Sequence, residues 1–330
     1  MKVTSALRRR IHAATGIVAA TAMLVVATVF GFANTARADE KLVRPTQIAP
    51  AVWFVQGHAA LGSAANRNFI SNAGFVVTGD GVVVVDGLGS PALAEELIGE
   101  VRRITPQPIK LVIVTHYHAD HIYGLQAFKA AGARILAHVA AKEYLNSETA
   151  QLRLQASRTE LAPWINESTH LVPADDWIDG DKTLRMGSYT FEIKHIGPSH
   201  TPEDLAVFVP EAQTLFAGDL VFRGRVPYVG QADSRKWIAS LERVLALKAR
   251  LLVPGHGPMS DKPAEDLQLT RDYLVYLRTK MGEAARNLES FEEVYAKTDW
   301  SRFEHLPLFR IANRMNAYNT YLLMEQQAEK

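Results

Sequence analysis

The chain has 330 residues, enough for one large domain with an appendage or for two domains. Its composition, 48% hydrophobic and 22% charged with a formal net charge of +1, is that of an ordinary globular protein. It has no cysteine, which excludes disulfides and thiolate ligands, so any metal must be held by imidazole and carboxylate groups.

The first 38 residues have the pattern of an export signal. Lys2 and three arginines at 8–10 precede an apolar stretch at residues 13–33, and Ala36-Arg37-Ala38 offers a small-x-small cleavage site. We expect an exported, periplasmic protein, with a periplasm-facing membrane anchor as the alternative if residues 13–33 are retained. Without the five basic residues of this segment, 31 basic residues face 35 acidic ones, a net charge of −4. That balance argues against nucleic acid as a partner.

Strand and helix signals alternate along the rest of the chain. In the first half we expect strands at 52–55, 68–77, 82–85, 111–114 and 134–138, with helices at 93–104, 122–131 and 140–158. In the second half we expect strands at 183–186, 189–195, 205–209, 214–216 and 250–253, with a helix at 234–247. Beyond Pro263 the pattern is helical, at 263–286, 291–297 and 309–327. Two halves of this kind predict a layered sandwich with helices outside both sheets.

A cluster of potential metal ligands follows the strand at 111–114. His116, His118, Asp120 and His121 lie within six residues, where a strand end opens onto a loop. A tetrahedral ion with an open catalytic position needs three protein ligands, so four from one loop indicate two ions.

Three more candidates lie just past later apolar runs, each beside Gly or Pro: His200, Asp219 and His256. The other histidines lack such a setting, and we interpret them as structural or surface residues. Among them, His195 alternates with Phe191 and Ile193 on its strand, which favours a place in the core.

These residues, in this order and spacing, make the chain resemble the metallo-β-lactamase fold superfamily of hydrolases. The match spans residues 50–260 and adds Asp86 where the family has a structural aspartate. The resemblance implies an α/β fold, the αββα four-layer sandwich, at residues 39–262, and a helical C-terminal extension at 263–330. It further implies two divalent ions, zinc ahead of iron or manganese. One would be held by His116, His118 and His200, the second by Asp120, His121 and His256, and Asp219 would bridge both.

The activity implied is that of an exported dinuclear hydrolase, in which a metal-bridging hydroxide attacks a small ester, thioester or lactone-like substrate. Asp120 would orient the nucleophile or shuttle its proton. His118 favours hydrolysis, because the oxygen-reducing diiron branch has Glu there. Asp219 is similar to the pattern of glyoxalase-II-like thioesterases and lactonases, and exported hydrolases beside sulfur-oxidation and quinoprotein systems are the most similar branch. The alternatives are an iron-dependent persulfide dioxygenase, a β-lactam hydrolase and a non-catalytic binding protein on the same fold.

Three residues are candidates for contacts with the substrate. Arg223 and Arg225 follow Asp219 closely, so either could hold an anionic group by bidentate hydrogen bonds. Tyr117 borders the ligand loop and could donate to an oxyanion.

Overall fold

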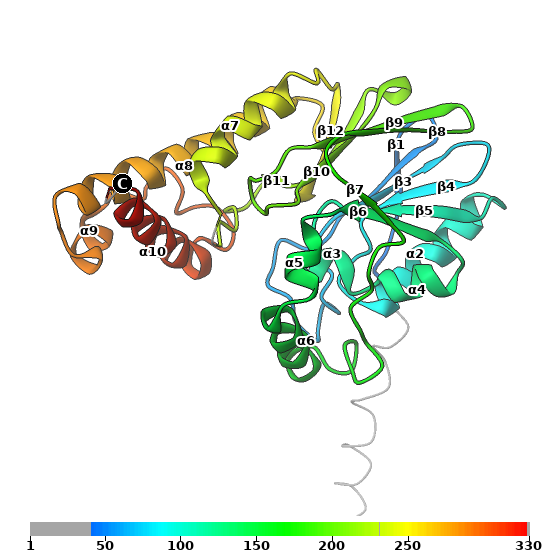
Figure 1. Cartoon of the computed structure of the whole chain (residues 1–330), viewed down its shortest axis with the longest axis horizontal. Helices are drawn as coiled ribbons and strands as arrows, with labels where there is room; N and C mark the ends of the chain where they lie inside the picture. Colours follow the sequence, from blue (N-terminus) through cyan, green and yellow to red (C-terminus); the bar gives the residue numbers. More distant parts are fainter. Residues whose placement is uncertain (1–40, 231, 329–330) are drawn as a thin grey trace, which may run out of the picture. The chain divides into compact units, whose positions relative to one another are not determined.

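A computed structural model of the chain describes residues 41–230 and 232–328 (Figure 1). The expected export segment at 1–38 lies outside the described residues. Among the helices of the described ranges, none is both long and apolar enough to cross a membrane.

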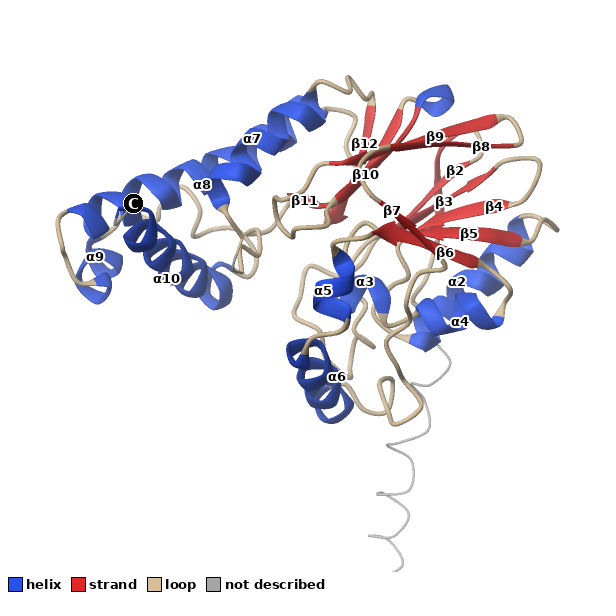
Figure 2. Cartoon of the chain, in the orientation of Figure 1, coloured by secondary structure: helices blue, strands red, loops and turns tan. Residues whose placement is uncertain are grey.

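The chain forms two β-sheets, drawn in red in Figure 2. The first has seven strands in sequence order, β1 (Thr46–Ala49), β2 (Val52–Val55), β3 (Ala73–Val77), β4 (Val82–Val85), β5 (Ile109–Ile113), β6 (Arg134–His138) and β7 (Asp176–Ile178). The second has five strands in the order β12 (Leu251–His256), β11 (Thr214–Phe222), β10 (Leu205–Val209), β9 (Tyr189–His195) and β8 (Lys182–Met186). Strands β4 to β7 run parallel, as do β11 and β12, and the other neighbours are antiparallel.

Helices cover the outer face of each sheet (Figure 1). Those of the first half are α2 (Pro91–Ile104), α3 (Ala119–Ile122), α4 (Leu125–Ala130), α5 (Ala141–Leu145) and α6 (Glu148–Glu160). Those of the second half are α7 (Ser234–Leu245) and α8 (Pro263–Arg286), with a 3₁₀ turn η1 at Pro210–Ala212. The last two helices, α9 (Phe291–Lys297) and α10 (Phe309–Ala328), pack on α8 away from the sheets (Figure 1). The predicted α/β sandwich with a helical C-terminal extension is confirmed. The predicted boundary between residues 262 and 263 falls between β12 and α8.

Strand β4 shows how the layers are specified by sequence. Val82 and Val84 belong to the core shared with α2, whereas Val83 and Val85 belong to the core between the two sheets. All four side chains are almost fully buried. A continuous valine run is therefore a strand that is buried on both faces, as expected when helices cover a sheet that also packs on another.

A third apolar core joins the second sheet to α7 and the C-terminal helices. It contains Trp237 of α7, Leu252 of β12, Leu274 of α8 and Ala317 of α10, each fully buried. The C-terminal extension is therefore continuous with the core of the second sheet.

Two predicted helices are each divided in two, and two edge strands are additional. The expected helix at 140–158 breaks before Ser147, whose Oγ accepts the Ala150 N–H at 3.1 Å and caps α6. The expected helix at 122–131 is divided into α3 and α4 around Gly124. The additional strands β1 and β7 are short and begin with polar residues, Thr46-Gln47 and Asp176, so they lack the apolar run that marks β2 and β4 in the sequence.

Candidate metal centre

Seven predicted ligands meet at one edge of the two sheets. His116 and His118 lie in the loop after β5, Asp120 and His121 begin α3, and His200 lies between β9 and β10. Two positions differ from the predicted strand ends. Asp219 lies inside β11, which continues to Phe222, and His256 is the last residue of β12. Both extensions are irregular, because the β11–β12 register shifts on either side of Gly218.

The seven side chains fall into two groups whose ligand atoms lie within 4.8 Å of one another. The first group is His116, His118, His200 and Asp219; the second is Asp120, His121 and His256. In the first, His200 Nε2 is 3.0 Å from His118 Nδ1 and 3.3 Å from Asp219 Oδ2. In the second, Asp120 Oδ2 is 3.3 Å from His256 Nε2 and 3.6 Å from His121 Nε2.

Asp219 lies between the two groups. Its Oδ2 is 3.3 Å from His256 Nε2 as well as from His200, and its Oδ1 is 3.2 Å from His121 Nε2. Two glycines, Gly255 and Gly218, leave room for Asp219 to lie this close to the histidines. A Cβ at Gly255 would stand 2.0 Å from Asp219 Oδ1, and one at Gly218, where φ is +52°, would stand 2.7 Å from the hydroxyl of Thr115.

The histidines present the correct nitrogens for divalent ions. His256 Nδ1 donates to the Ile70 carbonyl at 2.7 Å, and His121 Nδ1 donates to Asp86 Oδ2 at 2.9 Å. Nε2 of each ring is thereby left without a proton, as a metal requires. Nε2 of His116 and of His121 are buried without a hydrogen-bond partner among the described residues. Two ligands of one tetrahedral zinc lie about 3.3 Å apart, because each is about 2.0–2.1 Å from the ion, and the separations above are of this size. The residues therefore fit a pair of such ions.

Asp86 orients a histidine in each group. It accepts the N–H of Thr115 at 2.8 Å and the hydroxyl of Thr115 at 2.9 Å, in addition to His121 Nδ1. Because that hydroxyl donates to Asp86, its oxygen can accept from His116 Nδ1, 3.0 Å away. One buried carboxylate thus fixes the tautomers of His116 and His121 together.

The charges of the cluster act against one another when no ion is bound. Burial lowers the pKa of His200 to about 3 and, with the neighbouring His121, holds the pKa of His116 well below its usual value. Burial also opposes the charged form of Asp219, yet the surrounding histidines hold its pKa well below the usual range. His116 and His200 are therefore neutral imidazoles beside the ionised Asp219, as donors to a divalent cation must be. Burial opposes the charged form of His121, but Asp120, Asp219 and Asp86 raise its pKa well above the usual value, so an ion bound there would displace a proton.

A cavity of about 920 Å³ opens over the cluster. It exposes Asp120 and His118 at its floor, and its walls include Leu61, Tyr144 and Tyr228. The Tyr228 ring centroid is 6.2 Å from that of His118, and the Tyr144 ring centroid is 6.5 Å from it. Sequence reasoning missed Tyr144 as a wall residue, because it lies in α5, in a different segment from the ligands.

The three predicted substrate contacts have different positions. Arg225 lines the cavity and is 6% exposed. Arg223 does not line it, because its Nε donates to Asp266 Oδ1 at 2.8 Å and its Nη1 to the Met259 carbonyl at 2.8 Å, which ties β11 to α8. Tyr117 is fully buried, does not line the cavity and donates its hydroxyl to Val172 at 3.1 Å. The structure therefore does not bring Arg223 or Tyr117 to the cavity, since the hydrogen-bonding groups of both serve internal contacts.

The remaining described histidines lie outside both ligand groups. His195 is half-buried, and its ring stacks on the buried His138 with centroids 3.6 Å apart. It therefore packs against another imidazole instead of lying deep in the core.

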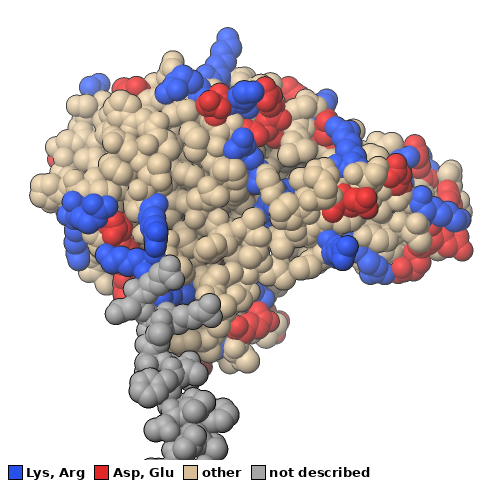
Figure 3. Space-filling model, turned by 180° about the vertical axis from the view of Figure 1, so that it is seen from behind, with Lys and Arg blue, Asp and Glu red and all other residues tan. Residues whose placement is uncertain are grey.

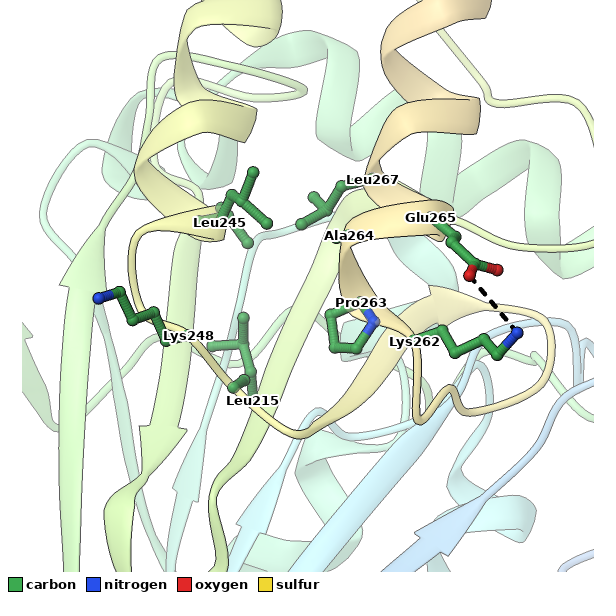
Figure 4. A pocket seen from close by; sticks show the side chains of 10 residues that line it. Leu215, Leu245, Lys248, Lys262, Pro263, Ala264, Glu265 and Leu267 are labelled. Carbon is green, nitrogen blue, oxygen red and sulfur yellow. Dashed lines mark ion pairs between the residues drawn. The ribbon is translucent and has the colours of Figure 1, made fainter.

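A second cavity, of about 610 Å³, lies where α7 ends and α8 begins (Figure 4). Leu215, Leu245 and Leu267 surround it, and the one acidic residue in its wall, Glu265, pairs with Lys262 at 3.4 Å. It contains no histidine, so it offers no metal site of the kind described above.

Comparison with known proteins agrees with this geometry. The family model described as the metallo-beta-lactamase superfamily matches residues 66–256. The chain is 31% identical to a metallo-beta-lactamase type 2 of Bacillus sp. (strain 170), over 66% of this chain and 77% of the relative. It is 28% identical to a linear primary-alkylsulfatase of Pseudomonas sp. (strain ATCC 19151), over 60% of this chain and 44% of the relative.

Among solved structures, the chain is similar to the stereoselective inverting sec-alkylsulfatase Pisa1 from Pseudomonas sp. The TM-score is 0.68 at 17% identity, over 85% of this chain and 50% of that one. The chain thus spans half or less of the length of the alkylsulfatases it matches. The match of the family model covers more than half of the chain and includes all seven clustered residues. The chain therefore belongs to the metallo-beta-lactamase superfamily and is a hydrolase of that superfamily.

Proposed function

We propose that the protein is an exported dinuclear metallohydrolase that cleaves a small ester-type bond. The observation that carries the proposal is the pair of ligand groups with Asp219 between them, within 3.3 Å of ligand atoms of both. Ions held there would lower the pKa of a bound water towards neutrality and polarise the substrate oxygen. Export to the periplasm is supported by the signal pattern of residues 1–38.

Asp120 has the position of a proton carrier. Its side chain is 16% exposed, against 4% for Asp219, and it lines the floor of the cavity. A carboxylate that contacts both the cluster and the cavity can accept the proton of the attacking water and pass it to the leaving group. Asp219 is enclosed by histidines and is better suited to holding the ions.

The reacting bond is best supplied by an acyl ester, thioester or lactone, with an alkyl sulfate ester as the second candidate. The sulfate ester is favoured by the two alkylsulfatases, because the structural match covers 85% of this chain and so extends well beyond residues 66–256. Because one relative is a metallo-beta-lactamase, a cephalosporin is also tested as a substrate. Nucleic acid is not among the expected substrates, and Figure 3 shows acidic and basic side chains interspersed on one face.

The test is turnover by the purified mature chain, loaded with zinc, on a panel of thioester, lactone, phosphodiester, sulfate ester and cephalosporin substrates. We expect about two zinc ions per chain and hydrolysis of an ester-type member. Asp120→Ala should abolish turnover while the protein stays folded. Asp261→Ala, which removes an exposed carboxylate outside the cavity, is the matched control. Full activity of Asp120→Ala, or one iron per chain with oxygen uptake on a persulfide, would overturn the proposal.

A further inference from the structure

We propose that Glu203 forms a cation subsite beside the metal centre, and that the ester-type substrate cleaved there carries an ammonium group. The ammonium would bind to the carboxylate, and the reacting bond would lie over the ions. This inference rests on the proposed function and names the class of substrate for the same site.

The carboxylates that line the cavity over the metal centre differ in what they contact. They belong to Asp120, Glu160, Glu203, Asp219 and Asp233. Two of these residues are members of the ligand groups. Glu160 pairs with Arg153 at 3.2 Å, and Asp233 caps the first turn of α7. Glu203 is the one whose charge has neither a ligand role nor a cap or ion pair within the described ranges.

Glu203 is a buried carboxylate with unused acceptor capacity. It is 4% exposed, and its Oε1 accepts the Tyr117 N–H at 3.1 Å. Its Oε2 accepts no hydrogen bond from the described part of the chain, and no Lys, Arg or His nitrogen there lies within 4.0 Å of the carboxylate. That oxygen is not fully enclosed, so it opens onto the cavity that Glu203 lines. A buried charge without a partner is unfavourable, and a bound cation would supply the partner.

The adjacent Asp204 shows the contrast. Its Oδ2 accepts the Thr201 N–H at 2.8 Å and its Oδ1 accepts the Thr201 hydroxyl at 2.7 Å, so both oxygens serve the loop itself. The N–H groups of Ile196 and Gly197 donate to the Asp204 carbonyl at 2.9 and 3.1 Å. These bonds fix the loop that carries Glu203 before a ligand arrives, which reduces the entropy lost on binding.

An aromatic ring near the carboxylate favours an organic cation. Tyr144 lines the cavity with its ring centroid 6.5 Å from that of His118, and Glu203 is bonded to the N–H of the residue before His118. Burial raises the pKa of Tyr144 to about 12, and the negative charge of Glu203 acts in the same direction. The face of an aromatic ring attracts an ammonium group. One carboxylate offers too few ligands for a third metal ion, so an organic cation fits the subsite better.

Another wall of the same cavity is held in place by α10. The Asn316 amide donates to the Pro227 carbonyl at 2.7 Å and accepts the Val229 N–H at 3.0 Å. Asn319, one turn further along, donates to the Gly230 carbonyl at 2.7 Å. Val229 and Gly230 line the cavity, so the rest of the substrate would meet a surface that is already formed.

The test measures probe binding without turnover. Pentylammonium, pentyltrimethylammonium and uncharged pentan-1-ol, none of which can be hydrolysed, are titrated calorimetrically into the zinc-loaded full chain near neutral pH. We expect Glu203→Gln to weaken binding of at least one cation by about 10- to 100-fold, because the charge that attracts it is lost, and to leave pentan-1-ol unaffected.

The substitution separates charge from structure. The amide oxygen of Gln can still accept the Tyr117 N–H, so zinc content and urea unfolding of Glu203→Gln should match the wild type. Glu167→Gln, whose side chain is 84% exposed and lies outside the cavity, is the matched control.

The two cations distinguish primary from quaternary ammonium groups. Loss confined to pentylammonium supports a primary ammonium, which donates hydrogen bonds to the carboxylate, and loss confined to pentyltrimethylammonium supports a quaternary one. Wild-type binding of both cations by a folded Glu203→Gln protein, or no binding of either by the wild type, would overturn the subsite even if esters are hydrolysed. Conversely, weakened cation binding with no turnover of any ester would leave the subsite standing and overturn the proposed function.

Discussion

Replacing Asp86 by Asn should remove the second ion while leaving the fold intact. Asp86 has φ of +66°, a conformation that Asn tolerates well, so the backbone should be retained. The Asn oxygen can still accept the Thr115 N–H, but its amide N–H₂ then faces Thr115 Oγ1 and His121 Nδ1. The amide nitrogen cannot accept from His121 Nδ1–H, so the proton would move to Nε2, the atom that should bind the metal.

The magnitude follows from the three hydrogen bonds of Asp86. One is kept, and the loss of a charge-assisted bond to His121 should lower the free energy of unfolding by about 1.5–3 kcal/mol. Loss of such an orienting partner lowers metal affinity by about 10- to 100-fold. Zinc competition against a chromophoric chelator, with metal content after dialysis, measures the affinity, and urea unfolding measures stability. Asp80→Asn, at the exposed surface, is the control. An Asp86→Asn protein that keeps both ions at wild-type affinity would refute the role assigned to this carboxylate.

Three further outcomes are expected. Asn316→Ala leaves the buried carbonyl of Pro227 and N–H of Val229 without partners, so urea unfolding should show a loss of about 2–4 kcal/mol with zinc content unchanged; unchanged stability would contradict the loop restraint. Removing metal with a chelator should lower the melting temperature and abolish turnover, and restoring zinc should recover both; a melting temperature indifferent to metal would contradict a bound ion. Burial and the stacked His195 lower the pKa of His138, so the folded state binds fewer protons than the unfolded one. The contribution of neutral His138 to the free energy of unfolding is therefore complete above about pH 6.5 and decreases as the pH falls below it. Urea unfolding from about pH 8 to 5 should show a smaller decrease in the free energy of unfolding for His138→Asn than for wild type.

The metal edge could be predicted because its information is local. Each candidate ligand follows an apolar run and stands beside Gly, Pro or another ligand, so spacing alone indicated which residues gather, although the strands that carry Asp219 and His256 run further than predicted. Even the run of four valines in β4 could be assigned, because its length and β-branched content suit a strand covered on both faces.

The cavity could not be predicted in the same way, because its walls come from segments far apart in sequence. Arg223 and Arg225 are two residues apart and equally plausible as anion ligands, yet Asp266 of α8 pairs with one and leaves the other open. Tyr117 is next to two ligands, but its side chain is buried in the core, where its hydroxyl donates to the Val172 carbonyl. Tertiary neighbours, and not proximity in sequence, decide which polar group is left for a substrate.

Helix α10 hydrogen-bonds to the loop at residues 227–230 through Asn316 and Asn319. The residues of the metal edge and the helix that supports the cavity wall are therefore encoded in different parts of the gene. Residues that assemble the metal edge are all encoded before position 257, whereas the helix that shapes the opposite wall is encoded after position 308. Mutations in α10 can therefore alter which molecules fit without touching any ligand or its hydrogen-bond partners. For laboratory evolution, libraries directed at α10 and at the loop it restrains would explore substrate range while the reactive centre stays constant.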